Sequence, residues 1–317
     1  MSAPPLSMIF LHALIYIALA PLLVGWIRKV KARLQNRRGA SVFQPYRDLK
    51  KLFTKEVHVA HTASPLFRIA PYVVLVSTWL AAMTIPAIAV DVPTSAVADL
   101  IVLVGLLALG RFFLALAGMD VGTAFGGMGA SREMLISALA EPAMLMAVFT
   151  LTMQAHSTNL STVVAHQLDL GFTLKPSLLF ALAALSLVAI AETGRIPVDN
   201  PATHLELTMI HEAMLLEYSG RHLALMEWAA HIKLMLYAVL IVAVFFPWGM
   251  ARTVDQPALA IAMLATLGKL AILGVVLATA ETVLAKMRLF RAPALLNLAL
   301  LLGLIGLLSH VILEIGV

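Results

Sequence analysis

The residues best suited to proton chemistry lie in one polar stretch, residues 191–220, which reads AETGRIPVDNPATHLELTMIHEAMLLEYSG. Carboxylates and imidazoles bind and release protons, and histidine does so near neutral pH. The stretch therefore predicts a proton path or coupling site, although ordinary solvation of a polar loop would explain any one of these residues equally well. The candidates are Glu192, Arg195, Asp199, His204, Glu206, His211 and Glu217.

The spacing within this stretch adds a geometric expectation. If residues 204–217 form a helix, Glu206 and Glu217 are about three turns apart and share one face, whereas His204 and His211 share the opposite face. Such an arrangement suits proton transfer along a helix. The two histidines lack the four-residue spacing of helical zinc ligands, so we predict no metal site and no catalytic centre in this chain.

Further ionisable residues fall inside or at the ends of apolar stretches, where burying a charge in lipid is costly. Arg111, Glu141, Lys269 and Glu281 belong to this group. We add Glu141, Lys269 and Glu281 to the candidate proton path. For Lys269 and Glu281 this rests on position alone, and a structural ion pair between neighbouring helices is the alternative.

The amino-acid composition indicates that most of the chain is surrounded by lipid rather than by water. Of the 317 residues, 61% are hydrophobic and 12% are charged, whereas soluble domains are about a quarter charged. We therefore expect an all-α polytopic membrane protein in contact with the lipid bilayer. The absence of cysteine excludes disulfides and Cys-ligated iron–sulfur clusters within this chain.

Eight stretches are long and apolar enough to be transmembrane helices of a single membrane domain, residues 1–317. The first is followed by Arg28 and Lys29, which is the wrong charge order for a cleaved signal peptide, so it stays as a membrane helix. The predicted spans are 6–27, 69–90, 97–118, 134–155, 177–193, 230–249, 257–280 and 294–315.

The basic residues give the orientation. Eleven of the 22 Lys and Arg residues lie between Arg28 and Arg68. By the positive-inside rule, loops 28–68, 119–133, 194–229 and 281–293 are cytoplasmic and both termini lie on the outer side of a bacterial inner membrane. Because the basic residues flank membrane segments, we expect no nucleic-acid partner despite the net charge of +5.

The first cytoplasmic loop contains RLQNRRGASVFQPYRDLKKLFTKE, residues 33–56. From Val42 onward, apolar residues recur at near-helical spacing between basic ones, which predicts an amphipathic helix over 42–56 in the membrane interface. An ordinary positive-inside loop is the alternative.

The order of residues in this loop resembles the respiratory complex I subunit 1 family, the NADH–quinone oxidoreductase component that joins the membrane arm to the hydrophilic arm. Where the family has Gly-Pro, this chain has Gly39-Ala40. The resemblance implies that this loop docks a soluble arm. The residues that carry the match are Arg33, Arg37, Gln44, Asp48, Lys51 and Glu56.

Two more stretches match the family pattern. The third cytoplasmic loop has Glu192-Thr193, Arg195, Pro197 and Asp199, with Val198 where the family has Phe, and it ends in the unchanged sequence EYSG, residues 217–220. In GASREMLISALAEP, residues 129–142, an Arg and a Glu nine residues apart also match; they are Arg132 and Glu141. The family role in a polar path into the membrane thereby carries over to Glu141, Glu192, Glu206 and Glu217.

The chain departs from the pattern of the quinone-reducing members of this family, and these departures indicate which branch of the family it resembles most. Ala202 and His204 replace two of three acids that follow the proline of the family motif, and the interval from Glu206 to Glu217 is longer. The chain therefore looks closest to the group 4 membrane-bound hydrogenases, the branch of hydrogenase-4 component C and formate hydrogenlyase subunit 4. We expect no functional quinone site.

The resemblance implies a component of a multisubunit, ion-translocating oxidoreductase that docks the electron-transfer arm and links electron flow to proton or sodium movement. The implied partners are hydrogenase-like large and small subunits, an iron–sulfur subunit and antiporter-like membrane subunits. Iron–sulfur clusters and a [NiFe] centre would belong to those partners, and this chain would bind no cofactor. The alternatives are the quinone-site subunit of complex I and a stand-alone secondary transporter.

Overall fold

The computed structural model describes residues 6–90, 98–171, 175–199, 209–252, 255–288 and 291–314. These residues form helices and connecting segments, with no named strand among them. Seven helices are long and apolar enough to cross a membrane, so the prediction of an all-helical multi-pass membrane protein is confirmed. They are α1 (Leu6–Leu34), α3 (Pro65–Met83), α4 (Leu100–Asp120), α5 (Ala124–Ala155), α9 (Gly220–Phe245), α10 (Gln256–Val283) and α11 (Ala292–Ser309), which continues as a π-helical turn (His310–Glu314).

The fifth of the eight predicted spans, 177–193, corresponds to α7 (Pro176–Glu192), which has 17 residues and is shorter than the seven other helices. At about 1.5 Å per residue it covers about 25 Å, less than a typical hydrocarbon core. It ends at the buried Glu192, and the chain then turns at Gly194, whose φ of 57° is in the left-handed region that glycine tolerates. Within the described residues, length and composition therefore identify seven spans rather than the predicted eight.

Two spans begin earlier than the apolar pattern predicts. Helix α5 starts at Ala124 rather than near residue 134, with the Thr123 hydroxyl accepting a hydrogen bond from the Gly126 amide. Helix α9 starts at Gly220 rather than near residue 230. The added N-terminal segments contain charged residues that hydropathy assigns to loops: Arg132 in α5 and Arg221 in α9. A further short helix, α6 (Leu160–Leu170), has no counterpart in the predicted elements; Asn159 caps its first amides.

The segment between α1 and α3, which the sequence predicts to be cytoplasmic, contains α2 (Gln44–Phe53), within the predicted range of 42–56. Leu49 is buried on its inner face, and the Phe53 ring meets Trp228 of α9 edge-on at 6.0 Å between centroids. The Tyr46 hydroxyl donates to the Ala18 carbonyl of α1. This helix is therefore packed against the bundle by one apolar face.

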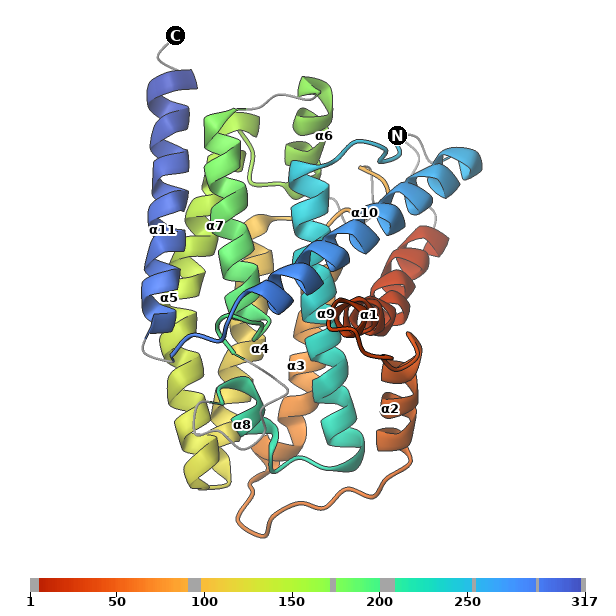
Figure 1. The fold of residues 1–317 in the computed structure, drawn as a ribbon, viewed down its shortest axis with the longest axis vertical. Coiled ribbons are helices and arrows are strands. Elements are labelled where there is room, and N and C mark those ends of the chain that lie inside the picture. The colour runs from red at the N-terminus through yellow and green to blue at the C-terminus, as the bar shows by residue number, and fades with distance from the viewer. Residues whose placement is uncertain are drawn as a thin grey trace.

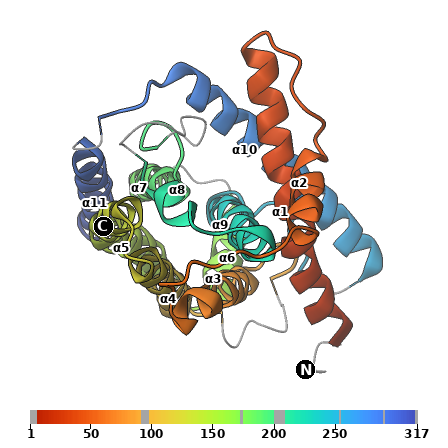
Figure 2. The same ribbon diagram turned by 90° about the horizontal axis from the view of Figure 1, so that it is seen from below.

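The helices form an upright bundle crossed by two oblique ones. Helix α9 lies inside the bundle, with 78% of its most apolar window buried, and contacts α1, α3 and α7. Helices α4 and α5 continue the bundle from α3, and α11 packs on the outer side against α5 and α7 (Figures 1 and 2). Helices α1 and α10 run obliquely along one side and contact each other. Helix α11 ends at the upper end of Figure 1, opposite α2 and the short α8 (His211–Leu215).

The expected helix over residues 204–217 is not continuous. Residues 204–208 lie outside the described residues, Met209 and Ile210 are not helical, and α8 covers only His211–Leu215. Side chains replace helical hydrogen bonds here, because the Ile210 amide donates to Asp199 and the Met209 carbonyl accepts from Arg132. The predicted shared faces of Glu206 with Glu217, and of His204 with His211, therefore lose their structural basis.

Candidate functional site

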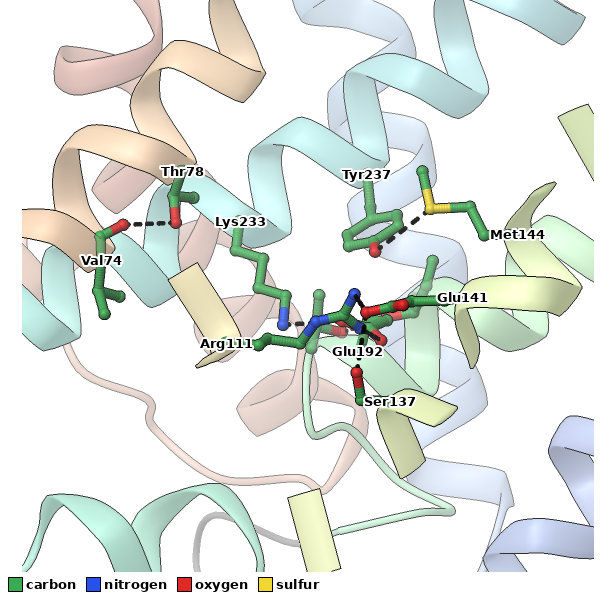
Figure 3. Close-up of polar contacts among 11 residues, drawn as sticks. Val74, Thr78, Arg111, Ser137, Glu141, Met144, Glu192, Lys233 and Tyr237 are labelled. Carbon is green, nitrogen blue, oxygen red and sulfur yellow. Dashed lines mark hydrogen bonds and ion pairs between the residues drawn. The ribbon is translucent and has the colours of Figure 1, made fainter. Parts of the chain in front are cut away.

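A buried charge network joins four helices near the middle of the bundle (Figure 3). Arg111 of α4 is 6% exposed and reaches two carboxylates, Glu192 at the end of α7 and Glu141 in α5. Helix α4 approaches α3 closely at the preceding residue, since a Cβ at Gly110 would lie 2.8 Å from the Ser77 hydroxyl. The close approach of the two helices fixes the position of Arg111 beside both acids.

Lys233 of α9 completes this network, with its Nζ 2.9 Å from Glu192 Oε2. The Ser137 hydroxyl, one turn before Glu141 in α5, donates to that carboxylate at 3.0 Å. Two cations, Arg111 and Lys233, thus face two anions, Glu141 and Glu192. Buried charges are tolerated only when they are compensated in this way.

A small polar cavity of about 50 Å³ adjoins the network. Its wall includes Arg111, Glu192 and Lys233 together with Thr78 of α3 and His211 of α8. A polar space of this size has room for a few water molecules, each with several hydrogen-bonding partners. The cavity therefore connects the loop between α7 and α9, through His211, to the charges inside the bundle.

His211 is neutral at physiological pH. Burial, followed by the positive charge of Lys233, lowers the pKa of the imidazole from 6.5 to about 4, although Asp199 and Glu192 act in the opposite direction. A neutral imidazole can accept a proton from one side and donate one on the other. His211 is the one candidate histidine within the described ranges that adjoins the buried network.

A second ion cluster lies where α10 ends. Glu281 accepts hydrogen bonds from Lys31 of α1 at 2.7 Å and from Arg195 at 2.9 Å. Asp199 lies 3.5 Å from Lys286 and also holds the Ile210 amide. For Glu281 the structure thus shows the interhelical ion pair that was the structural alternative, and the proton-path assignment stays a prediction.

The remaining candidates lie apart from these clusters. The Lys269 ammonium caps backbone carbonyls of Phe246 and Trp248 at the end of α9, about 20 Å along the helix from Lys233. Glu217 is exposed beyond α8. His204 and Glu206 lie outside the described residues.

The residues predicted to dock a soluble arm are distributed along one exposed segment. Arg33, Arg37, Lys51 and Glu56 are exposed, whereas Gln44 and Asp48 are half-buried and hydrogen-bonded to each other at 2.8 Å across one turn of α2. Charges of both signs are therefore presented on the surface at this end of the molecule.

Sequence reasoning assigns no role to several residues that form the network. Hydropathy places Lys233 at the edge of a loop, and it identifies Arg111 as a charge within a span without giving it a place on the path. Lys31, Lys286 and Glu133 also stand outside the predicted site. The sequence feature that could have identified these residues is the one that identified the acids: each is an ionisable residue within or beside an apolar stretch. The partners cannot be identified from sequence, because pairing requires the packing of helices that are distant along the chain.

An apolar cavity of about 140 Å³ lies beside the network, between α1, α7, α9 and α10. Thr193 lines both this cavity and the polar one, and Tyr237 of α9 forms part of its wall. No group of three or more metal-ligating His, Asp or Glu side chains occurs within the ranges that the structure covers.

Comparison with known proteins identifies relatives of this arrangement. A family model described as NADH dehydrogenase matches residues 6–311. The chain is 38% identical to hydrogenase-4 component C of Escherichia coli (strain K12) over 87% of each chain. It is 34% identical to formate hydrogenlyase subunit 4 of the same organism, over 89% of this chain and 91% of the relative.

More distant relatives share the same architecture. NADH-quinone oxidoreductase subunit 8 of Rhodothermus marinus is 28% identical over 72% of this chain and 69% of its own. A chain in the structure of the membrane-bound sulfane sulfur reductase, an archaeal respiratory membrane complex, superposes with a TM-score of 0.77 at 21% identity, covering 95% of this chain and 98% of the other. At that identity the match shows the fold alone. The sequence resemblance is confirmed by these relatives.

Proposed function

Because the chain belongs to the NADH dehydrogenase family, we propose that it is a membrane-anchor and coupling subunit of a multisubunit, ion-translocating oxidoreductase. The hydrogenase-4 and formate hydrogenlyase type fits best. The observation that carries this proposal is the match to the two Escherichia coli proteins over 87% and 89% of the chain. The third-loop departures from the quinone-reducing pattern, Ala202 and His204, point to the same branch.

The buried network supports the coupling part of this proposal. Glu192, Arg111 and Lys233 connect α7, α4 and α9, and His211 brings the third cytoplasmic loop to the same polar cavity. A change in charge or position at the loop would act directly on the buried ion pairs, because electrostatic interactions are strong in a dry interior. The pumped ion would be a proton or sodium.

The exposed first loop supports the docking part. Arg33, Arg37 and Lys51 are exposed in the segment that runs from the end of α1 through α2. Iron–sulfur clusters and a [NiFe] centre would be held by the soluble partners, since this chain has no cysteine to ligate them. The membrane partners would be antiporter-like subunits. The docking site would be the cytoplasmic face of a bacterial inner membrane, with both termini on the other side.

The experiment is purification of the tagged chain from its native membranes in mild detergent. We expect it to isolate with soluble subunits that contain iron–sulfur clusters and with hydrogenase-like large and small subunits. Isolation of the chain alone, able to move a solute in vesicles, would instead establish a stand-alone transporter.

One observation favours a second candidate, the quinone-site subunit of complex I. The apolar cavity reaches Thr193 beside the buried charges, and such a cavity could hold an isoprenoid chain with its headgroup near the network. The 28% identity to NADH-quinone oxidoreductase subunit 8 is compatible with this function. Inhibitor-sensitive quinone reduction by the purified complex would distinguish it.

A further inference from the structure

Glu133 differs from the other buried acids described above in its lack of a charged partner among the described residues. It lies in α5 with 8% of its surface exposed, and it makes no hydrogen bond or ion pair with the described residues. Glu192, Asp199 and Glu281 are equally buried, but each contacts at least one Lys or Arg. Those acids are counter-ions, whereas Glu133 has no counter-ion in contact among the described residues.

Charged groups of both signs surround Glu133 from other elements. The cations are Lys233 of α9 and Arg111 of α4, and the anions are Glu192 of α7 and Asp199 of the segment after it. None of these charged groups contacts Glu133, so no direct ion pair offsets the cost of removing a carboxylate from water. Burial without a contacting counter-ion favours the neutral, protonated form of this carboxyl group, which can give up a proton.

A hydroxyl and a second acid follow Glu133 along one face of the same helix. Ser137 and Glu141 are four and eight residues further on, which places the three side chains one above another at about 6 Å intervals. The Ser137 hydroxyl is buried and already donates to Glu141 Oε1 at 3.0 Å. Glu141 in turn contacts Arg111 of the central network.

The other end of this column lies against the third cytoplasmic loop. Arg132, the neighbour of Glu133, donates to the Met209 carbonyl at 3.0 Å. One turn earlier, a Cβ at Gly129 would lie 2.9 Å from the Ala213 Cβ of α8. Glu133 is thus located between the end of that loop and the buried acids.

We propose that Glu133 is a proton-carrying residue that links the third-loop segment to Glu141 through the Ser137 hydroxyl. For a transfer, the Glu133 side chain must first rotate until its carboxyl group donates a hydrogen bond to Ser137 Oγ. The Glu133 proton then moves to Ser137 Oγ while the Ser137 proton moves to Glu141 Oε1. Glu133 remains as a carboxylate and regains a proton from the α8 side, and no electron moves. This inference rests on the proposed coupling function and assigns its proton carrier.

The protonation state can be measured without any assay of activity. Infrared difference spectra of the purified complex, recorded in H₂O and D₂O at neutral pH, report the C=O stretch of a protonated carboxylic acid. We expect this band in the wild type and in Glu133→Asp, and its loss in Glu133→Gln. Asp169→Asn is the matched control, because Asp169 is exposed and paired with Arg252. A band of unchanged intensity in Glu133→Gln would overturn the proposal.

The role in transfer is tested in proteoliposomes. Glu133→Gln replaces one neutral group by another of similar shape, so subunit composition and thermal stability should not change. We expect the number of ions moved per electron to fall at least tenfold in this variant, and Asp169→Asn to match the wild type. Wild-type coupling in Glu133→Gln would refute the proposal. A wild-type complex that moves no ions would refute the coupling function instead, while the infrared result would still define the state of Glu133.

Discussion

Arg111 compensates two acids, the buried Glu192 and the partly exposed Glu141, and its charge is a condition for burying Glu192. Replacing it by methionine retains much of the side-chain length but leaves Glu141 without its cation and Glu192 with Lys233 alone. Breaking a buried ion pair by removing one partner costs about 3–5 kcal/mol. We therefore expect Arg111→Met to lower the thermal unfolding midpoint of the detergent-solubilised chain markedly.

The matched control for Arg111→Met is Arg252→Met, at an ion pair with Asp169 in which both side chains are more than half exposed. Exposed pairs contribute about 0–1 kcal/mol, so this variant should unfold close to the wild-type midpoint. Equal midpoints for Arg111→Met and the wild type would mean that the buried pairs contribute nothing to folding.

His211 makes stability depend on pH in a defined direction. Its folded-state pKa of about 4 lies below the ordinary value of 6.5, so the unfolded chain binds more protons between these values. The contribution of His211 is therefore complete above pH 6.5 and is lost as the pH falls towards 4. We expect the unfolding midpoint of His211→Gln to depend less on pH across this window than that of the wild type. Parallel curves would contradict a half-buried imidazole that stays neutral in the folded chain.

At the residue level, the sequence identifies which groups are ionisable within apolar stretches but not how they pair. Glu141 and Glu192 are predicted to act in one path, and a shared arginine joins them in the structure. Lys269 is grouped with them by position, although its partners are backbone carbonyls. Hydropathy gives the depth of a charge, whereas its partner depends on the rotation and packing of other helices.

At the scale of elements, the contact of α8 with α5 couples the third loop to the bundle. A methyl group at Gly129 would meet Ala213 at 2.9 Å and the Ile210 carbonyl at 3.0 Å, whereas one at Gly127 would meet nothing within 4 Å. We expect Gly129→Ala to shift α8 and to destabilise the chain by about 1–3 kcal/mol. Gly127→Ala should be neutral or slightly stabilising, because alanine favours helices.

The two glycine variants are compared by thermal unfolding and by hydrogen exchange of residues 209–215. Faster exchange in Gly129→Ala alone would support direct packing of α8 on α5. Identical behaviour of the two variants would show that α8 does not depend on this contact.

The first loop and α2 are expected to bind the soluble arm. Reversal of exposed charges in Arg37→Glu and Lys51→Glu should release soluble subunits during detergent extraction, because interfacial charges set the register and lifetime of such contacts. Arg252→Glu, at the opposite end of the molecule, is the control and should retain them. A normal subunit stoichiometry in the loop variants would mean that these basic residues act in topology alone.

The elements themselves are largely predictable from the sequence, and the reasons for the exceptions are physical. Seven apolar stretches form long helices, and α2 lies where amphipathic spacing places it. Helices α5 and α9 begin earlier because polar residues in their N-terminal segments, Glu133 and His222, are buried by protein rather than exposed in loops. The expected helix over 204–217 fails because Asp199 and Arg132 bind its backbone.

At the scale of the whole molecule, the apolar cavity near Thr193 raises the question of a quinone. Ala202 and His204 replace acids of the quinone-reducing pattern, and loss of those carboxylates changes the electrostatic potential and the protonation of anything bound nearby. We expect the purified complex not to reduce a soluble quinone in an inhibitor-sensitive way, although lipid chains can fill the cavity. Inhibitor-sensitive quinone reduction would instead assign the chain to the complex I branch of the family.

The central claim, that this chain couples electron flow in a soluble arm to ion movement, is tested most directly in proteoliposomes containing the purified complex. Electron transfer and ion uptake are measured together in the wild type and in Glu206→Gln and Glu217→Gln, the family-matched acids of the third loop. We predict ion uptake driven by turnover in the wild type, and uncoupled or abolished activity in both variants with subunit composition unchanged. Wild-type turnover and ion uptake in both variants, with intact assembly, would contradict the account.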